Sequence, residues 1–125
     1  MISIDYQSRT PLYEQIVERF QRLILKGILE PGSQMPSVRT LAVKLSINPN
    51  TIQKAYTLLE QQGYIYPVKG RGNFIADASR LLEQQQEHYL NELKQSLLRA
   101  KDFGITKDDC YTLIHKIYNK EVLHA

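Results

Sequence analysis

Four polar side chains lie close together in the segment NPNTIQKAYTLLEQQG, which begins at residue 48: Asn50, Thr51, Gln53 and Lys54. Asn and Gln can form paired hydrogen bonds with base edges in the major groove of DNA, and Lys binds phosphate. Apolar residues at positions 52, 55, 56 and 59 have helical spacing, which leaves the four polar side chains on another face. A helix start also offers free N–H groups and a positive dipole end to phosphate. The segment therefore predicts a DNA-reading helix, and a solvated helix face is the plainer alternative.

Arg39 stands near the start of an earlier predicted helix, away from its apolar positions. Arg forms bidentate contacts with guanine or with phosphate. We favour this interpretation over a surface charge or an intramolecular salt bridge. The hydroxyls of Ser37 and Thr40 flank Arg39 and could contact the DNA backbone.

The segment Lys69-Gly70-Arg71-Gly72 combines two cations with two glycines. The runs YIYPV before it and NFIA after it are rich in strand formers, so the whole predicts a β-hairpin with a cationic tip. Glycines allow the backbone to approach a ligand closely, which suits a tip lying along the minor groove. A hairpin tip that is merely soluble is the alternative. Pro67 cannot donate to a strand ladder and should face an open edge of the hairpin.

The elements that carry these candidates are two short helices joined by a tight turn and followed by the hairpin. Ser37 suits the N-cap of the first helix, and Asn48 caps the second, with Pro49 at its first position. Ile47 in the turn is expected to fill the gap between the helices, and Gly63 suits the end of the second one. This order is typical of a winged helix-turn-helix, which presents one helix and one hairpin tip to DNA.

A further helix is predicted before this region, from Pro11 to Lys26, because its apolar residues recur at spacings of three and four. Gly27 suits its C-terminal cap. Ile2 and Ile4 alternate with polar neighbours, so a short strand and an extended arm are both open for the N-terminus.

Residues 77–125 form a separate tail of two predicted helices, behind a DNA-binding domain of residues 1–76. The run from Ala78 to Phe103 has no Pro or Gly, and Gly104 ends it. Thr106 and Asp109 form a start for the last helix that is similar to a capping box, with Asp where Glu or Gln is usual. Two helices bury too little surface to be stable alone, so we expect the tail to pair with a second copy. The residues expected to form this dimer interface are Leu90, Leu93, Leu97, Ile114 and Ile117. Packing of these residues onto the DNA-binding domain of the same chain is the alternative.

Composition limits the class of protein. Apolar residues make up 42% of the 125 residues and charged residues 23%, and no run is long enough to span a membrane. Residues 1–76 hold nine Lys or Arg against five Asp or Glu, whereas residues 77–125 hold seven against eight. The single cysteine, Cys110, and the scattered His88, His115 and His124 lack metal-ligand spacing. We expect a cytoplasmic protein that has no enzymatic activity, metal or other cofactor.

Several of these motifs occur together, in order, in one known family. They are PLYEQI from Pro11, PSVR from Pro36, NPNT from Asn48, and the GRGNFI hairpin segment from Gly70. With Leu41-Ala42, Ala55-Tyr56, Leu59-Glu60 and Gly63 between them, residues 8–76 resemble the GntR family of bacterial transcription regulators. The short tail resembles that of the YtrA-like branch, because other branches carry much longer effector-binding domains.

The resemblance implies a mainly α fold with a hairpin wing, followed by a two-helix dimerisation tail. It implies a repressor that binds an inverted-repeat operator in double-stranded DNA as a homodimer, often at operons for transport systems. It also places Arg39, Thr51 and Gly70 at positions where relatives touch DNA. Many relatives carry Arg at the positions of Pro49 and Gln53, so we expect a different base sequence to be recognised here.

Two other classes of function stay open on the sequence alone. One is a winged-helix module that binds protein, and the other is an architectural DNA binder without sequence specificity. A small-molecule effector held between the tail helices is compatible with the sequence, which does not identify it.

Overall fold

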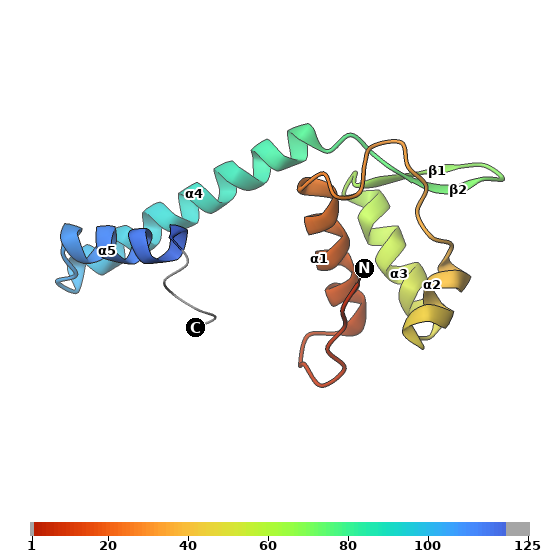
Figure 1. Cartoon of the computed structure of the whole chain (residues 1–125), viewed down its shortest axis with the longest axis horizontal. Helices are drawn as coiled ribbons and strands as arrows, with labels where there is room; N and C mark the ends of the chain where they lie inside the picture. The colour runs from red at the N-terminus through yellow and green to blue at the C-terminus, as the bar shows by residue number, and fades with distance from the viewer. Residues whose placement is uncertain (1, 120–125) are drawn as a thin grey trace. The chain divides into compact units, whose positions relative to one another are not determined.

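The computed structural model describes residues 2–119 (Figure 1). It is mainly helical with one two-stranded antiparallel hairpin, which confirms the predicted fold class. The elements in chain order are α1 (Leu12–Leu25), α2 (Val38–Leu45), α3 (Pro49–Gln61), β1 (Ile65–Val68), β2 (Gly72–Ile75), α4 (Ser79–Asp102) and α5 (Lys107–Tyr118). The chain forms two compact units, the head up to Gln84 and the tail from Gln85, and α4 contributes to both.

The core of the head lies between α1, α2, α3 and the base of the hairpin. The apolar residues of α1 and α3 face each other as their helical spacing predicts, and the rings of Phe20 and Tyr56 meet edge to face at 6.0 Å. The largest side chains with under 2% exposure are Tyr56, Phe20, Ile16, Ile52, Leu59 and Ile75. Because α3 is anchored along this whole inward face, its outward face is held in one orientation.

The ends of α2 and α3 confirm the predicted caps. The Ser37 hydroxyl accepts the N–H of Thr40 at 3.0 Å, and the Asn48 side chain accepts the N–H of Asn50 at 2.8 Å. Ser46 ends α2 in the left-handed region with φ of 54°, and the following Ile47 is buried between the helices. The short turn therefore fixes the angle between α2 and α3.

The hairpin has the predicted strands, with Tyr66 opposite Phe74 and Pro67 opposite Asn73. Backbone groups of residues 73 and 75 bond residues 32–35, which run beside β2: Gly32 N–H to Ile75 O, Ile75 N–H to Ser33 O, and Met35 N–H to Asn73 O. The backbone N–H and C=O groups of the other β2 residues therefore point toward β1. Pro67 lies with its nitrogen toward the open edge of the hairpin, as expected. The pairing of residues 32–35 with β2 was not predicted.

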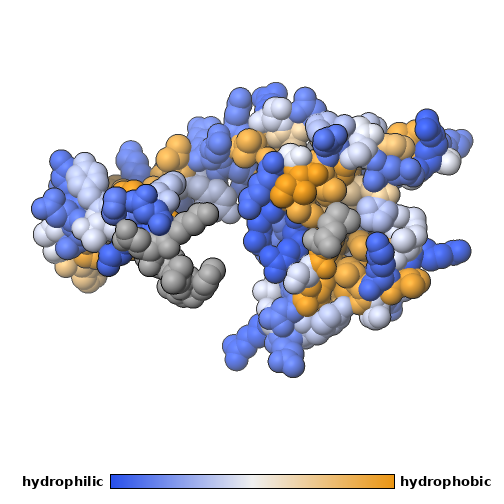
Figure 2. Space-filling view, viewed as in Figure 1, coloured by the Kyte–Doolittle hydropathy of each residue, from blue (hydrophilic) through white to orange (hydrophobic). Residues whose placement is uncertain are grey.

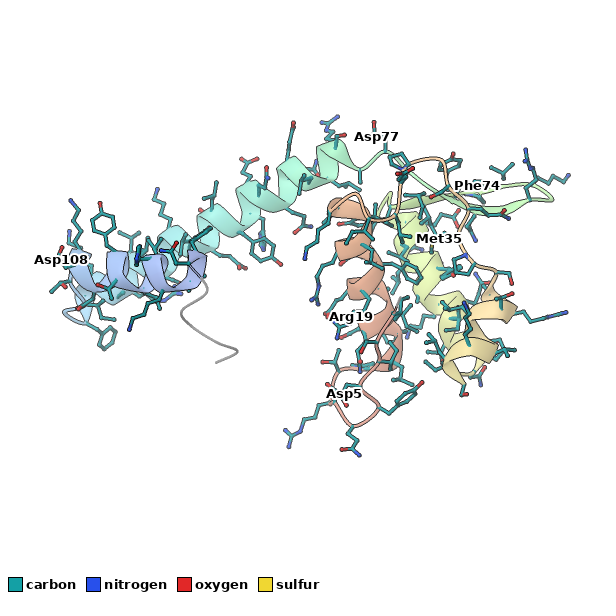
Figure 3. All side chains as sticks on the ribbon, in the orientation of Figure 1. Asp5, Arg19, Met35, Phe74, Asp77 and Asp108 are labelled. Atoms are coloured by element: carbon teal, nitrogen blue, oxygen red, sulfur yellow. The ribbon has the colours of Figure 1, made fainter. Side chains whose placement is uncertain are left out.

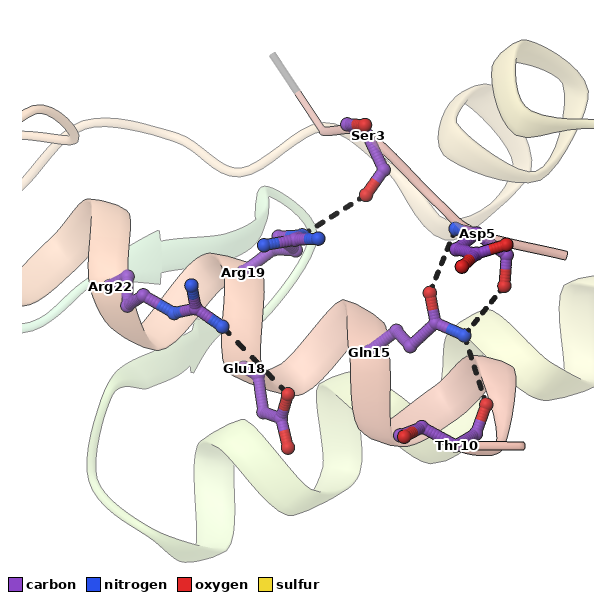
Figure 4. Close-up of polar contacts among 7 residues, drawn as sticks. All are labelled: Ser3, Asp5, Thr10, Gln15, Glu18, Arg19 and Arg22. Atoms are coloured by element: carbon purple, nitrogen blue, oxygen red, sulfur yellow. Dashed lines mark hydrogen bonds and ion pairs between the residues drawn. The ribbon is translucent and has the colours of Figure 1, made fainter. Parts of the chain in front are cut away.

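The N-terminal segment is an extended arm, since no strand forms among its described residues. Ile2 and Ile4 pack against the core. Gln15 on α1 is buried, and its side chain accepts the Asp5 N–H and donates to the carbonyls of Asp5 and Thr10, each at 2.9 Å (Figure 4). The sequence had suggested no role for Gln15, which holds the arm against the start of α1.

The tail contains most of α4 and all of α5. α4 has 24 residues, and α5 begins with the predicted capping box, in which Thr106 accepts the Asp109 N–H while Asp109 accepts the Thr106 N–H. Neither helix contains a buried residue. Among the described residues, none of the helices combines the length and hydrophobicity required to cross a bilayer.

Candidate nucleic-acid interface

The outward face of α3 carries the predicted polar side chains. Asn50, Gln53 and Lys54 are exposed and Thr51 is half-buried, whereas Ile52 and the other inward residues are buried. The Gln53 amide lies 3.3 Å from the hydroxyl of Thr57, one turn further along the same face. The sequence pattern did not single out Thr57, although its spacing of four from Gln53 places it on this face.

The start of α3 differs from the expectation of free N–H groups. Pro49 has no N–H, the Asn50 N–H bonds the Asn48 side chain at 2.8 Å, and the Thr51 N–H bonds the Asn48 carbonyl at 2.9 Å. The cap that starts the helix thus uses the donors that a phosphate would need. The expectation of free donors was wrong here, and the side chains of the outward face are the groups that α3 leaves available to a ligand.

Lys54 points toward α1 and its nitrogen lies 3.9 Å from the centre of the Tyr13 ring. The Tyr13 hydroxyl donates to the Glu14 carboxylate at 3.2 Å, and this bond to a carboxylate raises the pKa of Tyr13. A cation–π contact holds the Lys54 side chain at one edge of the α3 face, toward the start of α1.

The side chain of Arg39 on α2 is exposed and makes no hydrogen bond or ion pair with any part of the chain that the structure describes. The intramolecular salt bridge that the sequence left open is therefore absent from the described residues. The flanking hydroxyls are engaged with each other, since Ser37 donates to the Thr40 hydroxyl at 2.8 Å. Both remain exposed and keep lone pairs for further hydrogen bonds.

The hairpin tip carries the predicted cations. Lys69, Gly70, Arg71 and Gly72 are all exposed, and Gly70 and Gly72 have φ of 76° and 94°, which glycine adopts without strain. The Arg71 guanidinium lies 6.0 Å from the Phe74 ring, which itself stacks with Tyr66. In Figure 1 the tip and α2 lie on the same side of the head.

The charge of this region is strongly one-sided. Between residues 31 and 76, Glu60 is the single acid, whereas Arg39, Lys44, Lys54, Lys69 and Arg71 are basic. Figure 2 shows hydrophilic residues at the outer end of the hairpin. The arrangement offers exposed cations on α2, on α3 and at the hairpin tip to a polyanion.

The scaffold behind these side chains is tied together by Tyr56. Its hydroxyl donates to the Pro36 carbonyl at 2.7 Å, which links the middle of α3 to the residue before the α2 cap. Burial raises the pKa of Tyr56, so the hydroxyl keeps its proton and stays a donor. The link fixes the start of α2, with Arg39, relative to α3.

The predicted dimerisation residues of the tail are exposed in the single chain. Leu90, Leu93, Leu97, Ile114 and Ile117 are 41% to 66% exposed. A groove of about 370 Å³ between α4 and α5 is lined by Leu97, Ile105 and Ile114, with Lys101 and Lys107 also along it. Among the described residues no group of three or more His, Cys, Asp or Glu could hold a metal ion, and His124 lies outside them.

Comparison with known proteins places these features in a family. Residues 12–75 match the sequence model of the bacterial regulatory proteins of the gntR family. The chain is 40% identical over 119 residues to the HTH-type transcriptional repressor YtrA of Bacillus subtilis strain 168, covering 94% of this chain and 92% of that protein.

Solved structures agree with this match. A GntR family transcriptional regulator from Listeria monocytogenes has a TM-score of 0.71 and 34% identity, over 90% of this chain and 98% of that one. The AraR DNA-binding domain in complex with operator ORX1 has a TM-score of 0.55 and 29% identity, over 60% of this chain and 96% of that one. The second of these structures contains operator DNA.

Proposed function

This chain belongs to the gntR family of bacterial regulatory proteins, and we propose that it is a cytoplasmic transcriptional repressor that binds an inverted-repeat operator as a homodimer. Members of the family are transcription regulators with a DNA-binding winged helix-turn-helix, and they are not enzymes. Repression is proposed because the relative YtrA is named a repressor. An operon for a transport system is the proposed target, following the resemblance to the YtrA-like branch.

The observation that carries the proposal is the unpaired Arg39 beside the polar face of α3 and the cationic hairpin tip. An exposed Arg with no partner among the described residues loses no internal contact when it binds a guanine or a phosphate. A protein-binding module would not need cations on three separate elements with a single acid between residues 31 and 76.

The proposed contacts fall into two groups. Arg39, Asn50, Thr51 and Gln53 read base edges in the major groove, because forked or short polar side chains reach them from a helix start. Phosphate and minor-groove contacts come from a second set, which is Ser37, Thr40, Lys54, Lys69, Gly70, Arg71 and Gly72. The first set gives sequence specificity, and the second gives salt-sensitive affinity.

Two copies are proposed to pair through Leu90, Leu93, Leu97, Ile114 and Ile117, since these apolar side chains are exposed in the single chain. In this proposal residues 1–76 bind DNA and residues 77–125 form the dimer interface. Two-fold symmetry of the dimer then requires two half-sites in inverted orientation. A small effector could bind in the groove between α4 and α5.

Selection of bound DNA tests the proposal. The full chain is incubated with fragments of genomic DNA from its source organism, and retained fragments are sequenced and tested by mobility shift at two salt concentrations. We expect a few fragments to be retained, with a shared inverted repeat and with affinity that falls as salt rises. Equal retention of all fragments would instead identify an architectural binder, and absence of any shift would identify a protein-binding module.

A further inference from the structure

We propose that Gln34 is a positioning residue that holds the hairpin tip at a set place relative to the start of α2, so that the tip and Arg39 reach DNA together. Gln34 lies outside every element and is not among the residues assigned to the DNA contact. The inference rests on the proposed function, because it deepens the account of the same surface.

The geometry begins with the pairing of residues 32–35 along β2. Backbone bonds join Gly32 to Ile75 O at 2.7 Å and Met35 to Asn73 O at 2.8 Å, and Gln34 forms a bridge with Phe74. Figure 3 shows Met35 and Phe74 on these two neighbouring segments. The backbone pairing stops there, short of the hairpin tip.

The Gln34 side chain continues the pairing where the backbone cannot. Its amide nitrogen donates to the Arg71 carbonyl at 2.6 Å. A Cβ at Gly72 would stand 3.5 Å from the same nitrogen, so the side chain lies closely along the strand. The Gln34 amide thus adds one hydrogen bond to the pairing of residues 32–35 with β2, and this bond reaches a residue of the tip itself.

Little else restrains the tip. Within residues 2–119, no other hydrogen bond or ion pair joins residues 69–72 to a part of the chain outside the hairpin. The bond from Arg71 N–H to Val68 O closes the turn but does not orient it relative to α2. The Gln34 bond therefore restrains the tip, with Lys69 and Arg71, directly, whereas the backbone bonds of residues 32–35 restrain only the base of β2.

Gln34 is connected to α2 by a short and well-anchored path. The next residue, Met35, is 4% exposed in the core. The carbonyl of Pro36 accepts the Tyr56 hydroxyl at 2.7 Å, and Ser37 is the α2 cap. Five residues after Gln34 the chain reaches Arg39. The same anchored segment therefore places two of the cationic elements proposed to contact DNA, the α2 start and the hairpin tip.

The bond requires a donor at the end of a side chain of this length. Met has a similar length and no donor, so Gln34→Met removes the hydrogen bond while keeping most of the packing. Gln21 provides a matched control, because its amide also donates at 2.6 Å, to Gln62, on the α1 and α3 side of the head. Gln21→Met removes a comparable bond away from the hairpin.

The first test uses the free full chain and no DNA. Nitrogen-15 relaxation is measured at the backbone amides of Gly70, Arg71 and Gly72 in the native protein, Gln34→Met and Gln21→Met. We expect order parameters of about 0.85 in the native chain and the control, and below about 0.6 in Gln34→Met. Thermal unfolding checks that both variants fold. Unchanged order in a folded Gln34→Met overturns the inference, whatever the protein does with DNA.

The second test measures coupling in DNA binding, on a fragment that the native chain retains selectively. Gln34→Met should weaken binding about fivefold and lower the slope of log affinity against log salt by about one, the loss of one phosphate contact. Arg71→Ala should then reduce the free energy of DNA binding less than half as much in the Gln34→Met chain as in the native chain. Fully additive effects overturn the inference, because Gln34 would not act through the tip.

The two tests separate the inference from the proposed function. A native chain that selects no DNA overturns the proposed function and with it the DNA role of Gln34, while the relaxation data still report whether the bond orders the tip. A native chain that selects DNA, combined with an unaffected Gln34→Met, overturns the inference alone. Gln21→Met should match the native chain in affinity and salt slope throughout.

Discussion

At the scale of single residues, the candidate nucleic-acid interface combines side chains without an internal partner among the described residues and backbone N–H groups that already form hydrogen bonds. Arg39 has no internal partner among the described residues, whereas the N–H groups at the start of α3 are used by Asn48. A free guanidinium can form two parallel bonds to guanine without breaking an internal contact. Specificity in this protein is therefore expected to reside in side chains.

Replacement of Arg39 by Ala should weaken operator binding by about 1–3 kcal/mol, the usual worth of one bidentate base contact. The fold should be unchanged, because Arg39 is exposed and packs against nothing in the core. Fluorescence anisotropy on the selected operator measures the change, with Arg22→Ala as a control for loss of an exposed Arg on α1. Native-like affinity in Arg39→Ala would make this residue a plain surface charge.

Tyr56→Phe should destabilise the head by about 1–2 kcal/mol, because the Pro36 carbonyl loses its buried donor. Burial raises the pKa of Tyr56 above its usual 10.0. The contribution of the Tyr56 hydroxyl to the free energy of unfolding is therefore complete below pH about 10, and it falls at higher pH because Tyr56 then ionises in the unfolded chain. Denaturant titrations between pH 8 and about 11 should thus show a steeper loss of stability in the native chain than in Tyr56→Phe. Parallel curves would contradict this account.

At the scale of elements, α2, α3 and α5 are each started by a local signal that the sequence carries. Ser37, Asn48 and Thr106 each accept a backbone N–H of their own helix. α5 depends on its cap more than the others do, because none of its residues is buried within the single chain. Local and tertiary contributions to stability can therefore be separated best in α5.

Thr106→Ala should destabilise α5 by about 1 kcal/mol, the usual cost of losing an N-cap hydroxyl. The Thr106 backbone N–H lowers the pKa of Asp109, so this half of the capping box is present at neutral pH and is lost as pH falls below about 4. Hydrogen exchange of the α5 amides should be faster in Thr106→Ala. Thr112→Ala is the control, because Thr112 lies inside α5, away from the cap.

At the scale of the whole molecule, the head and the tail differ in how they are stabilised. The head has a continuous buried core that includes Ala78, and Leu81 at the start of α4 packs against it. The tail exposes its apolar side chains, and such surfaces are expected to be covered by a partner. A head fragment should therefore end near Gln84, where contacts separate the two units, and not near Ala76.

Leu97→Asp should convert the full chain from dimer to monomer, because a carboxylate would have to be buried without a partner in the proposed interface. Light scattering measures the mass, and operator affinity should fall with it, since two half-sites can no longer be bound together. Gln86→Asp adds the same charge on the exposed polar part of α4 and should remain dimeric. A Leu97→Asp chain that remains dimeric would exclude Leu97 from the main interface.

A head fragment of residues 2–84 should be monomeric by the same measurement, while retaining cooperative unfolding from its own core. It should bind a single half-site weakly and with a smaller salt slope than the full chain, since it neutralises fewer phosphates. A dimeric fragment would place the main interface in the head.

The sequence by itself determined the order of elements, their caps, and the family. These follow from local rules: apolar residues at helical spacing, side chains such as Ser37 and Asn48 at helix starts, and Gly63 and Gly104 at helix ends. Such signals depend on neighbours within a few residues, so they can be read without coordinates. The resemblance to the gntR family depends on the same ordered motifs.

The tertiary structure decided which groups are free and which are occupied. Only the fold showed that Gln15 is buried against the N-terminal arm, that Lys54 lies over Tyr13, and that Gln34 bonds the hairpin tip at Arg71. Each pairing with Gln15 or Gln34 joins a polar residue that looks exposed in the sequence to a backbone group 5 to 37 positions away. No periodicity encodes such a pair, because its partner is brought close by the packing of other elements.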